Sequence, residues 1–225
     1  MQLAEVDARE FPPEARMRVV LGILEGLEPG QSMVVVAPHE PAPLLRALLS
    51  EYPGRFDFAP LQRGPEVWRW QVHARDPAAT RSVSGYLGWD HRRMEELLHA
   101  TDAAAQAANW PEAARLAGCY ATALRRHADL EDEVLFPAYE QACGGFGDGP
   151  TAHMRDEHVE VRRGIDQLIR AVTARDATAV AAAREHMQQA AIEHHAKEEE
   201  ILFPAMDQLF PADALDALVR RLMTF

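Results

Sequence analysis

The part of this chain that follows residue 85 repeats itself, with 67 positions between each residue and its counterpart. The segment His-Ala-Asp-Leu-Glu-Asp-Glu-Val-Leu-Phe-Pro-Ala begins at His127, and the segment His-His-Ala-Lys-Glu-Glu-Glu-Ile-Leu-Phe-Pro-Ala begins at His194. His91 and His158 are separated by the same interval. Chance placement of ten histidines would rarely give this agreement. A duplicated helical hairpin is the simplest interpretation.

Each repeat places a glutamate four residues after a histidine. Residues at this spacing project from one face of an α-helix, so an imidazole and a carboxylate can reach the same point. With one further histidine from each hairpin, four helices would offer six groups of metal-binding types: His91, His127, Glu131, His158, His194 and Glu198. This donor set resembles a di-iron or di-manganese centre in a helical bundle. A single tetrahedral zinc would use only four of the six groups.

Less specific interpretations of these residues stay open at this point. The charged faces could be solvated helix surfaces, in which case the bundle is structural or holds one zinc ion. His195 and Glu199 form a rival pair with the same spacing, although alignment with His127 favours the pair one residue earlier. An extra ligand could come from one of four further residues: His153, Glu133, Glu157 or Tyr139.

Composition narrows the classes of partner. The formal net charge is −12, so nucleic acid is not expected as a partner. The sequence has no apolar stretch near the roughly 20 residues that span a bilayer, and its first seven residues lack the features of a targeting signal. The two cysteines, Cys119 and Cys143, suit buried thiols in a reducing compartment. We therefore expect a cytoplasmic protein that binds no membrane.

The first part of the chain alternates between strand and helix patterns. Pro12 and Pro13 favour a helix start, because proline is tolerated where the amide is unpaired. The expected strands are 3–6, 33–37, 55–59 and 67–72, and the expected helices are 13–27 and 42–52. The pattern predicts a small α+β domain with two layers, a sheet and two helices on one of its faces.

The rest of the chain is rich in alanine and helical in pattern. The expected helices are 86–107, 111–140, 151–173 and 177–208, with a short tail helix at 212–222. The longest break is 144–150, which joins the two hairpins. The predicted organisation is an α+β domain at 1–75, a linker at 76–85, an all-α four-helix bundle at 86–210 and a tail at 211–225.

The bundle region resembles the hemerythrin-like HHE cation-binding domain, down to the Leu-Phe-Pro that ends both metal-binding segments. This resemblance implies a non-haem di-iron centre with two iron ions and an oxo or hydroxo bridge. The implied ligands are the six residues named above, with Glu131 and Glu198 bridging both irons. Each iron would then keep one open position for a small diatomic ligand, O2 or NO.

One departure separates this sequence from the oxygen carriers of that family. The carriers have a further histidine one helical turn before the histidine of the third helix, where this chain has Met154. His153 lies five residues before His158, about 140° around the helix, and is a poor substitute. The set of four histidines and two glutamates is more similar to the bacterial proteins that repair iron-sulfur clusters after nitrosative stress.

The first region resembles a bacterial domain of uncharacterised function that is related to the TusA-type sulfur carriers. The resemblance rests on 6–13, on 27–32 with the valine-rich strand that follows, and on the closing strand pair. Sulfur carriers hold sulfur on a cysteine just before the proline that opens the first helix. Here Phe11 precedes Pro12 and the domain contains no cysteine, which excludes persulfide transfer. For this first domain we therefore expect a regulatory or partner-binding role.

Three hypotheses for function follow. The first is a di-iron protein that binds or reacts with O2 or NO in the response to oxygen or nitrosative stress. The second is a sensor of a diatomic ligand, of redox state or of iron, which signals through a protein partner of the first domain. The third is an iron donor for cluster repair.

Overall fold

The computed structural model describes residues 4–76, 78–145 and 149–225 of the chain. Leu3 of the expected first strand, Pro77 of the expected linker and 146–148 of the expected break lie outside the described residues. The chain divides into two compact units, Met1–Arg81 and Ser82–Met223. Each unit has its own core and is described separately below.

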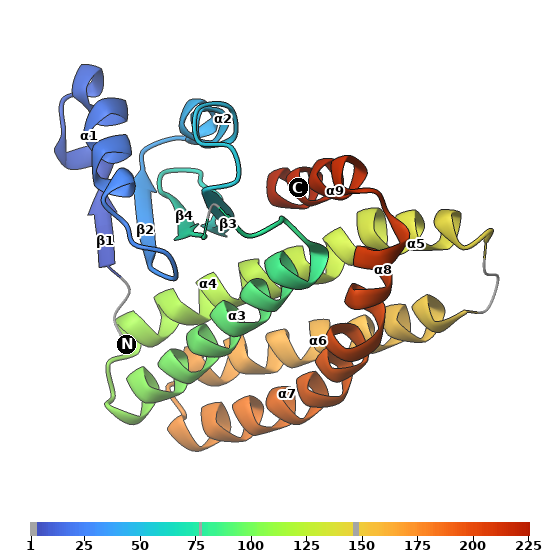
Figure 1. The fold of residues 1–225 in the computed structure, drawn as a ribbon. Coiled ribbons are helices and arrows are strands. Elements are labelled where there is room, and N and C mark those ends of the chain that lie inside the picture. Colours follow the sequence, from blue (N-terminus) through green and yellow to red (C-terminus); the bar gives the residue numbers. More distant parts are fainter. Residues whose placement is uncertain (1–3, 77, 146–148) are drawn as a thin grey trace. The chain divides into compact units, whose positions relative to one another are not determined.

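The first unit is built on a four-stranded sheet with the strand order β1-β2-β4-β3 (Figure 1). Strand β1 (Ala4–Asp7) is parallel to β2 (Ser32–Ala37). Strand β4 (Trp68–Ala74) is antiparallel both to β2 and to β3 (Phe56–Gln62). The last two strands in the sequence are therefore paired, as their pattern predicts.

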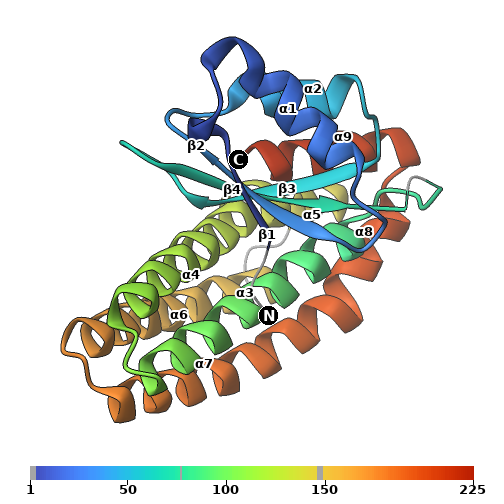
Figure 2. The ribbon, with the colours of Figure 1, turned by 90° about the vertical axis from the view of Figure 1, so that its left-hand side faces the viewer.

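Two helices cover one side of this sheet, as both views show (Figure 2). Helix α1 (Pro13–Glu25) begins at the second proline of the pair, where a missing amide is harmless. Helix α2 (Ala42–Ser50) follows β2. Their apolar faces bury Leu24 and Leu48 in the core of this unit. The predicted small α+β domain is confirmed.

The second unit is an all-α bundle, as predicted. Its long helices are α3 (Val83–Gln106), α4 (Trp110–Leu130), α6 (Pro150–Thr173) and α7 (Ala177–Lys197). Helix α3 packs against α4 and α7, and helix α6 also packs against α4 and α7, which closes the bundle. Its interior is therefore accessible to side chains from all four helices.

The duplication extends to the backbone of the two hairpin turns. Ala108 and Arg175 are counterparts, and both adopt the left-handed conformation, with φ of 56° and 54°. The next residues, Asn109 and Asp176, cap α4 and α7 by accepting hydrogen bonds from backbone N–H groups three residues on. The two hairpins therefore share their turn geometry as well as their sequence pattern.

Both glutamates of the predicted ligand set begin π-helical turns, which the sequence did not predict. The expected helices 111–140 and 177–208 are interrupted at η2 (Glu131–Leu135) and η3 (Glu198–Leu202). In each turn a phenylalanine N–H donates to the carbonyl of the glutamate five residues earlier. The proline that follows each phenylalanine explains the turn, because its ring would clash with a carbonyl in a regular α-helix.

Short helices complete the second unit. Helices α5 (Phe136–Ala142) and α8 (Phe203–Leu209) continue directly from the two π-helical turns. Helix α9 (Ala212–Thr224) extends two residues beyond the expected tail helix and buries Val219 and Leu222. Among the described residues, none of the helices combines the length and the apolar character needed to cross a membrane.

Candidate metal centre

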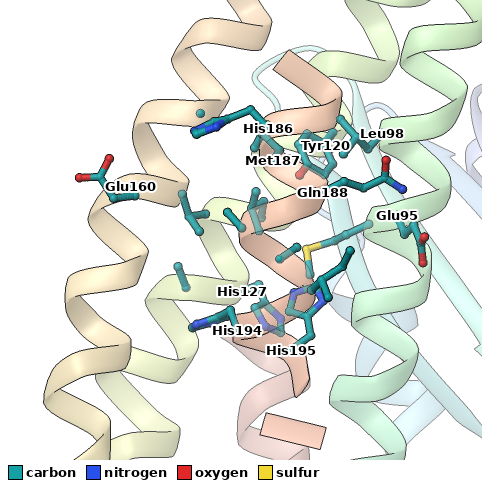
Figure 3. A pocket seen from close by; sticks show the side chains of 18 of the residues that line it. Glu95, Leu98, Tyr120, His127, Glu160, His186, Met187, Gln188, His194 and His195 are labelled. Atoms are coloured by element: carbon teal, nitrogen blue, oxygen red, sulfur yellow. The ribbon is translucent and has the colours of Figure 1, made fainter. Parts of the chain in front are cut away.

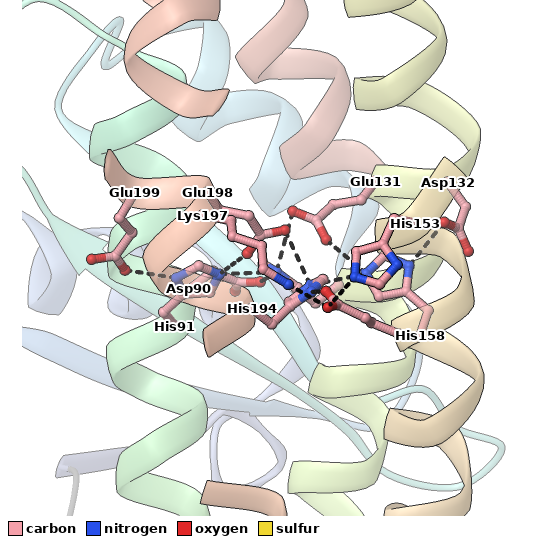
Figure 4. A network of polar contacts seen from close by, with 12 residues as sticks. Asp90, His91, Glu131, Asp132, His153, His158, His194, Lys197, Glu198 and Glu199 are labelled. Atoms are coloured by element: carbon pink, nitrogen blue, oxygen red, sulfur yellow. Dashed lines mark hydrogen bonds and ion pairs between the residues drawn. The ribbon is translucent and has the colours of Figure 1, made fainter. Parts of the chain in front are cut away.

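The six residues predicted as ligands converge in the interior of the bundle (Figure 4). Helices α3, α4, α6 and α7 each contribute one histidine, and the two π-helical turns contribute the glutamates. All six side chains are buried, and the two glutamates have no exposed surface. Polar groups at this depth need partners, so their arrangement decides what the site can hold.

The first half of the centre contains His91 and His127. Their Nε2 atoms lie 3.1 Å apart. Glu198 Oε2 is 3.3 Å from His91 Nε2, and Glu131 Oε1 is 3.4 Å from His127 Nε2. Each histidine of this pair therefore has one carboxylate oxygen close to its Nε2 atom.

The second half contains His158 and His194 and has the same arrangement. Their Nε2 atoms lie 3.2 Å apart. Glu131 Oε2 is 3.3 Å from His158 Nε2, and Glu198 Oε1 is 3.2 Å from His194 Nε2. Each glutamate therefore places one oxygen near a histidine of each half. The two carboxylates lie between the two pairs of histidines.

The carboxylate oxygens of Glu131 and Glu198 lack hydrogen-bond partners among the described residues. Burial and the nearby charge of Glu198 raise the pKa of Glu131 well above its usual value. Burial acts in the same direction on Glu198, but the imidazoles of His194 and His91 outweigh it and lower the pKa of that carboxyl. Two buried carboxylates without donors are costly unless cations lie between them. The donor atoms of Glu131, His158, His194 and Glu198 all lie within 4.8 Å of one another, so these residues fit a metal ion.

Each of the four histidines also contacts a carboxylate through Nδ1. The distances are 2.7 Å for His91–Glu199, 2.9 Å for His127–Asp90, 2.8 Å for His158–Asp132 and 2.7 Å for His194–Glu157. An ionised carboxylate only accepts hydrogen bonds, so Nδ1 carries a proton and Nε2 is the ring nitrogen that faces the centre. These contacts orient the histidines as metal binding requires.

These Nδ1 carboxylates are functional groups that the sequence reasoning missed. Asp90 and Glu157 are repeat counterparts, and so are Asp132 and Glu199. Glu157, considered above as an extra ligand, instead accepts from His194. The 67-residue interval was the signal that could have found all four, since it relates them as it relates the ligands.

The other residues considered as extra ligands lie apart from the paired Nε2 atoms. The His153 side chain is 69% exposed and forms an ion pair with Glu157. Glu133 is exposed, and Tyr139 interacts with Cys143. The rival pair is divided between α7 and η3. Glu199 accepts from His91, and the ring of His195 stacks on that of His91 with 3.6 Å between centroids and 7° between planes.

A cavity of about 380 Å³ reaches the centre from within the bundle. His127, His194 and His195 lie together at one end of the lining in Figure 3, and His186 and Tyr120 lie at the other. Most of the remaining lining is apolar and includes Met94, Leu98, Leu124, Val161 and Met187. The cavity thus joins the histidines to a space that favours small uncharged molecules.

Paired histidine and carboxylate groups in the interior of a helical bundle are typical of metal-binding helical bundle proteins. The chain belongs to the family described as Hemerythrin HHE cation binding domain, which matches residues 87–206 and, in a second overlapping match, 149–224. Residues 5–74 match the family described as Uncharacterized conserved protein (DUF2249). Both predicted family resemblances are confirmed. Comparison with curated proteins and with solved structures gives no significant match.

Proposed function

We propose that the bundle binds two iron ions and uses them to bind or react with O2 or NO. The ligands are His91 and His127 for one ion and His158 and His194 for the other, with Glu131 and Glu198 shared. The observation that carries this proposal is the division of each glutamate, with one oxygen at 3.2–3.4 Å from a histidine Nε2 of each half. A carboxylate that lies between two pairs of histidines suits a binuclear site better than a mononuclear one.

Iron fits this donor set better than zinc does. Imidazole nitrogen and carboxylate oxygen suit iron in both its ferrous and ferric states. A structural zinc site is closed by four ligands and would leave half of the eight donor atoms unused. When bound, the two irons would supply the one-electron chemistry that O2 or NO requires.

The cavity supports a diatomic ligand. Its apolar lining meets His127, His158 and His194, and its volume of about 380 Å³ exceeds what a diatomic molecule needs. An uncharged gas partitions into such a space without the desolvation penalty that an ion would meet. The role of these residues is to hold the metals and to exclude bulk water from them.

The physiological setting that fits this chemistry is the response to oxygen or nitrosative stress. Donation of iron to damaged clusters is the alternative, and it requires metal that leaves readily. In the first unit, Phe11 and Pro12 occupy the place before α1, so that unit cannot carry sulfur there and is proposed to bind a protein partner. The predicted linker, 76–85, overlaps α3, which begins at Val83, so the proposed linker ends before that residue.

The first experiment is metal analysis of full-length protein purified without oxygen, with visible spectra recorded before and after addition of air or NO. We expect about two irons per chain and a new ligand-to-metal absorption band. Retention of both irons during prolonged incubation with a strong chelator would argue against iron donation. One zinc per chain without a spectral change would overturn the proposal.

His91→Ala and His194→Ala test the two halves separately. Each variant should keep roughly one iron, because each loses an imidazole from one half only. His186→Ala is the matched control, since this exposed histidine lines the same cavity away from the paired nitrogens. Two irons retained in both test variants would contradict the ligand assignment.

A further inference from the structure

His195 breaks the repeat that governs the rest of the centre. Its counterpart, 67 positions earlier, is Ala128. Each of the six predicted ligands has a counterpart of the same type 67 positions away. Each carboxylate that accepts from a histidine Nδ1 has an acidic counterpart at the same interval. The first half of the centre therefore has a neighbouring imidazole for which the second half has only a methyl group.

The position of His195 relates it to one half alone. Its ring lies parallel to that of His91, with 3.6 Å between centroids, and its donor atom lies within 4.8 Å of those of His91 and Glu198. The ring is farther from His127 and His194, at 6.4 and 6.0 Å between centroids. His195 is thus beside the first metal position and away from the second.

His195 differs from the other histidines of the centre in the hydrogen bonding of its ring. No hydrogen bond joins its ring nitrogens to another residue in the described ranges, whereas every other histidine of the centre has a carboxylate on Nδ1. The side chain is half-buried and lines the 380 Å³ cavity. An imidazole without a hydrogen bond to its ring nitrogens, beside a metal position, is available as a metal ligand.

We propose that His195 is a third imidazole ligand in the His91–His127 half, so that the two metal positions are chemically unequal. This inference rests on the proposed binuclear site. The first position has three imidazoles and two carboxylate oxygens, and the second has two of each.

The test is titration of metal-free, full-length protein with Co²⁺, whose visible spectrum reports the ligands of each ion. The wild type should show two classes of site with different affinities. His195→Ala should weaken by about ten-fold or more the class that His91→Ala abolishes, and should leave the class that His158→Ala abolishes unchanged. His195→Gln serves as a second variant that keeps most of the volume, and His186→Ala is the control.

The outcomes separate this inference from the proposed function. If both classes persist in His195→Ala and His195→Gln with affinities within about two-fold of the wild type, His195 is not a ligand. An equal loss from both classes would indicate a structural role and would also overturn the inference. Failure of the wild type to bind two Co²⁺ ions would overturn the binuclear site itself.

Discussion

The two halves of the metal centre share their inner groups but differ in what supports them. Asp90, which holds His127, has no exposed surface and contacts the guanidinium of Arg93. Its counterpart Glu157, which holds His194, is 26% exposed and contacts Lys197. The carboxylate that accepts from the histidine is therefore fully buried in one half and partly exposed to solvent in the other.

A second cation strengthens this contrast. Arg126 is buried near Asp90 and donates to the hydroxyl of Tyr86 at 3.0 Å and to the carbonyl of Leu222 in α9. The counterparts of Arg93 and Arg126 are Glu160 and Glu193, both exposed. The duplicated pattern thus covers the groups that face the metals, whereas the support of His127 extends to the last helix of the chain.

The largest effect should come from the residues that the two halves share. Glu131→Ala removes a donor from both metal positions, so we expect iron content to fall more than about ten-fold. His91→Ala, which affects one half, should keep about half of the iron. Elemental analysis after gel filtration measures both. Equal iron content in the two variants would contradict the sharing of Glu131.

Removal of the buried support comes next. Asp90→Ala leaves Arg93 and Arg126 buried without their carboxylate, which should lower the free energy of unfolding by about 3–5 kcal/mol. Glu157→Ala should lower it by less than about 1 kcal/mol, because that carboxylate is partly exposed and its loss leaves Lys197 in reach of solvent. Urea unfolding of the metal-free proteins compares them. Equal losses would show that burial does not distinguish the halves.

The inner donors of the centre could be predicted from sequence because their types and their interval are both visible there. The four Nδ1 carboxylates obey the same interval, but the sequence does not show which helix each one faces. Asp132, for example, supports His158 of another helix rather than a residue of its own turn. Such pairings depend on helix packing, which spacing along one helix does not determine.

The π-helical turns show a different limit. Pro137 and Pro204 are plain in the sequence, but the expected helices 111–140 and 177–208 run through both of them. Whether the chain stops, kinks or widens at such a proline depends on how its neighbours are packed. Phe136 and Phe203 are fully buried, so the bundle favours a widened turn that keeps both rings in the core.

The pH dependence of metal binding is the next test. Burial lowers the pKa of His91, but Glu198 and Glu199 outweigh it and raise the value to about 9. Burial lowers the pKa of His127 to about 4. At neutral pH the metal-free first half therefore holds a proton on His91, in the place that a metal would take.

Metal must displace that proton, so the affinity of the first half for Co²⁺ should rise with pH up to about 9, by about ten-fold per pH unit. The same raised pKa stabilises the metal-free fold below pH about 6.5, and this contribution is lost as pH rises through about 9. Calorimetric titration in buffers of different ionisation enthalpy counts the protons released. An affinity that does not change between pH 6 and 9 would show that no proton occupies the site.

The smallest effects should come from the carboxylates that accept from His91 and His158, Glu199 and Asp132. Glu199 is 49% exposed, so water can replace its carboxylate on the His91 Nδ1 in Glu199→Ala. We expect the Co²⁺ affinity of the first half to fall by less than about ten-fold, and stability to change by less than about 0.5 kcal/mol. Asp132→Ala should weaken the second half more, because Asp132 is only 22% exposed and less accessible to a replacing water.

Together with Asp90→Ala, these two variants rank the carboxylates by burial. If exposure controls how firmly each histidine is held, the loss of affinity should increase in the order Glu199, Asp132, Asp90. Each variant removes one Nδ1 partner and leaves the Nε2 donor in place, so the ranking isolates the effect of solvent on that hydrogen bond. A loss for Glu199→Ala as large as that for Asp90→Ala would mean that the charge of the carboxylate, and not its burial, orients these imidazoles.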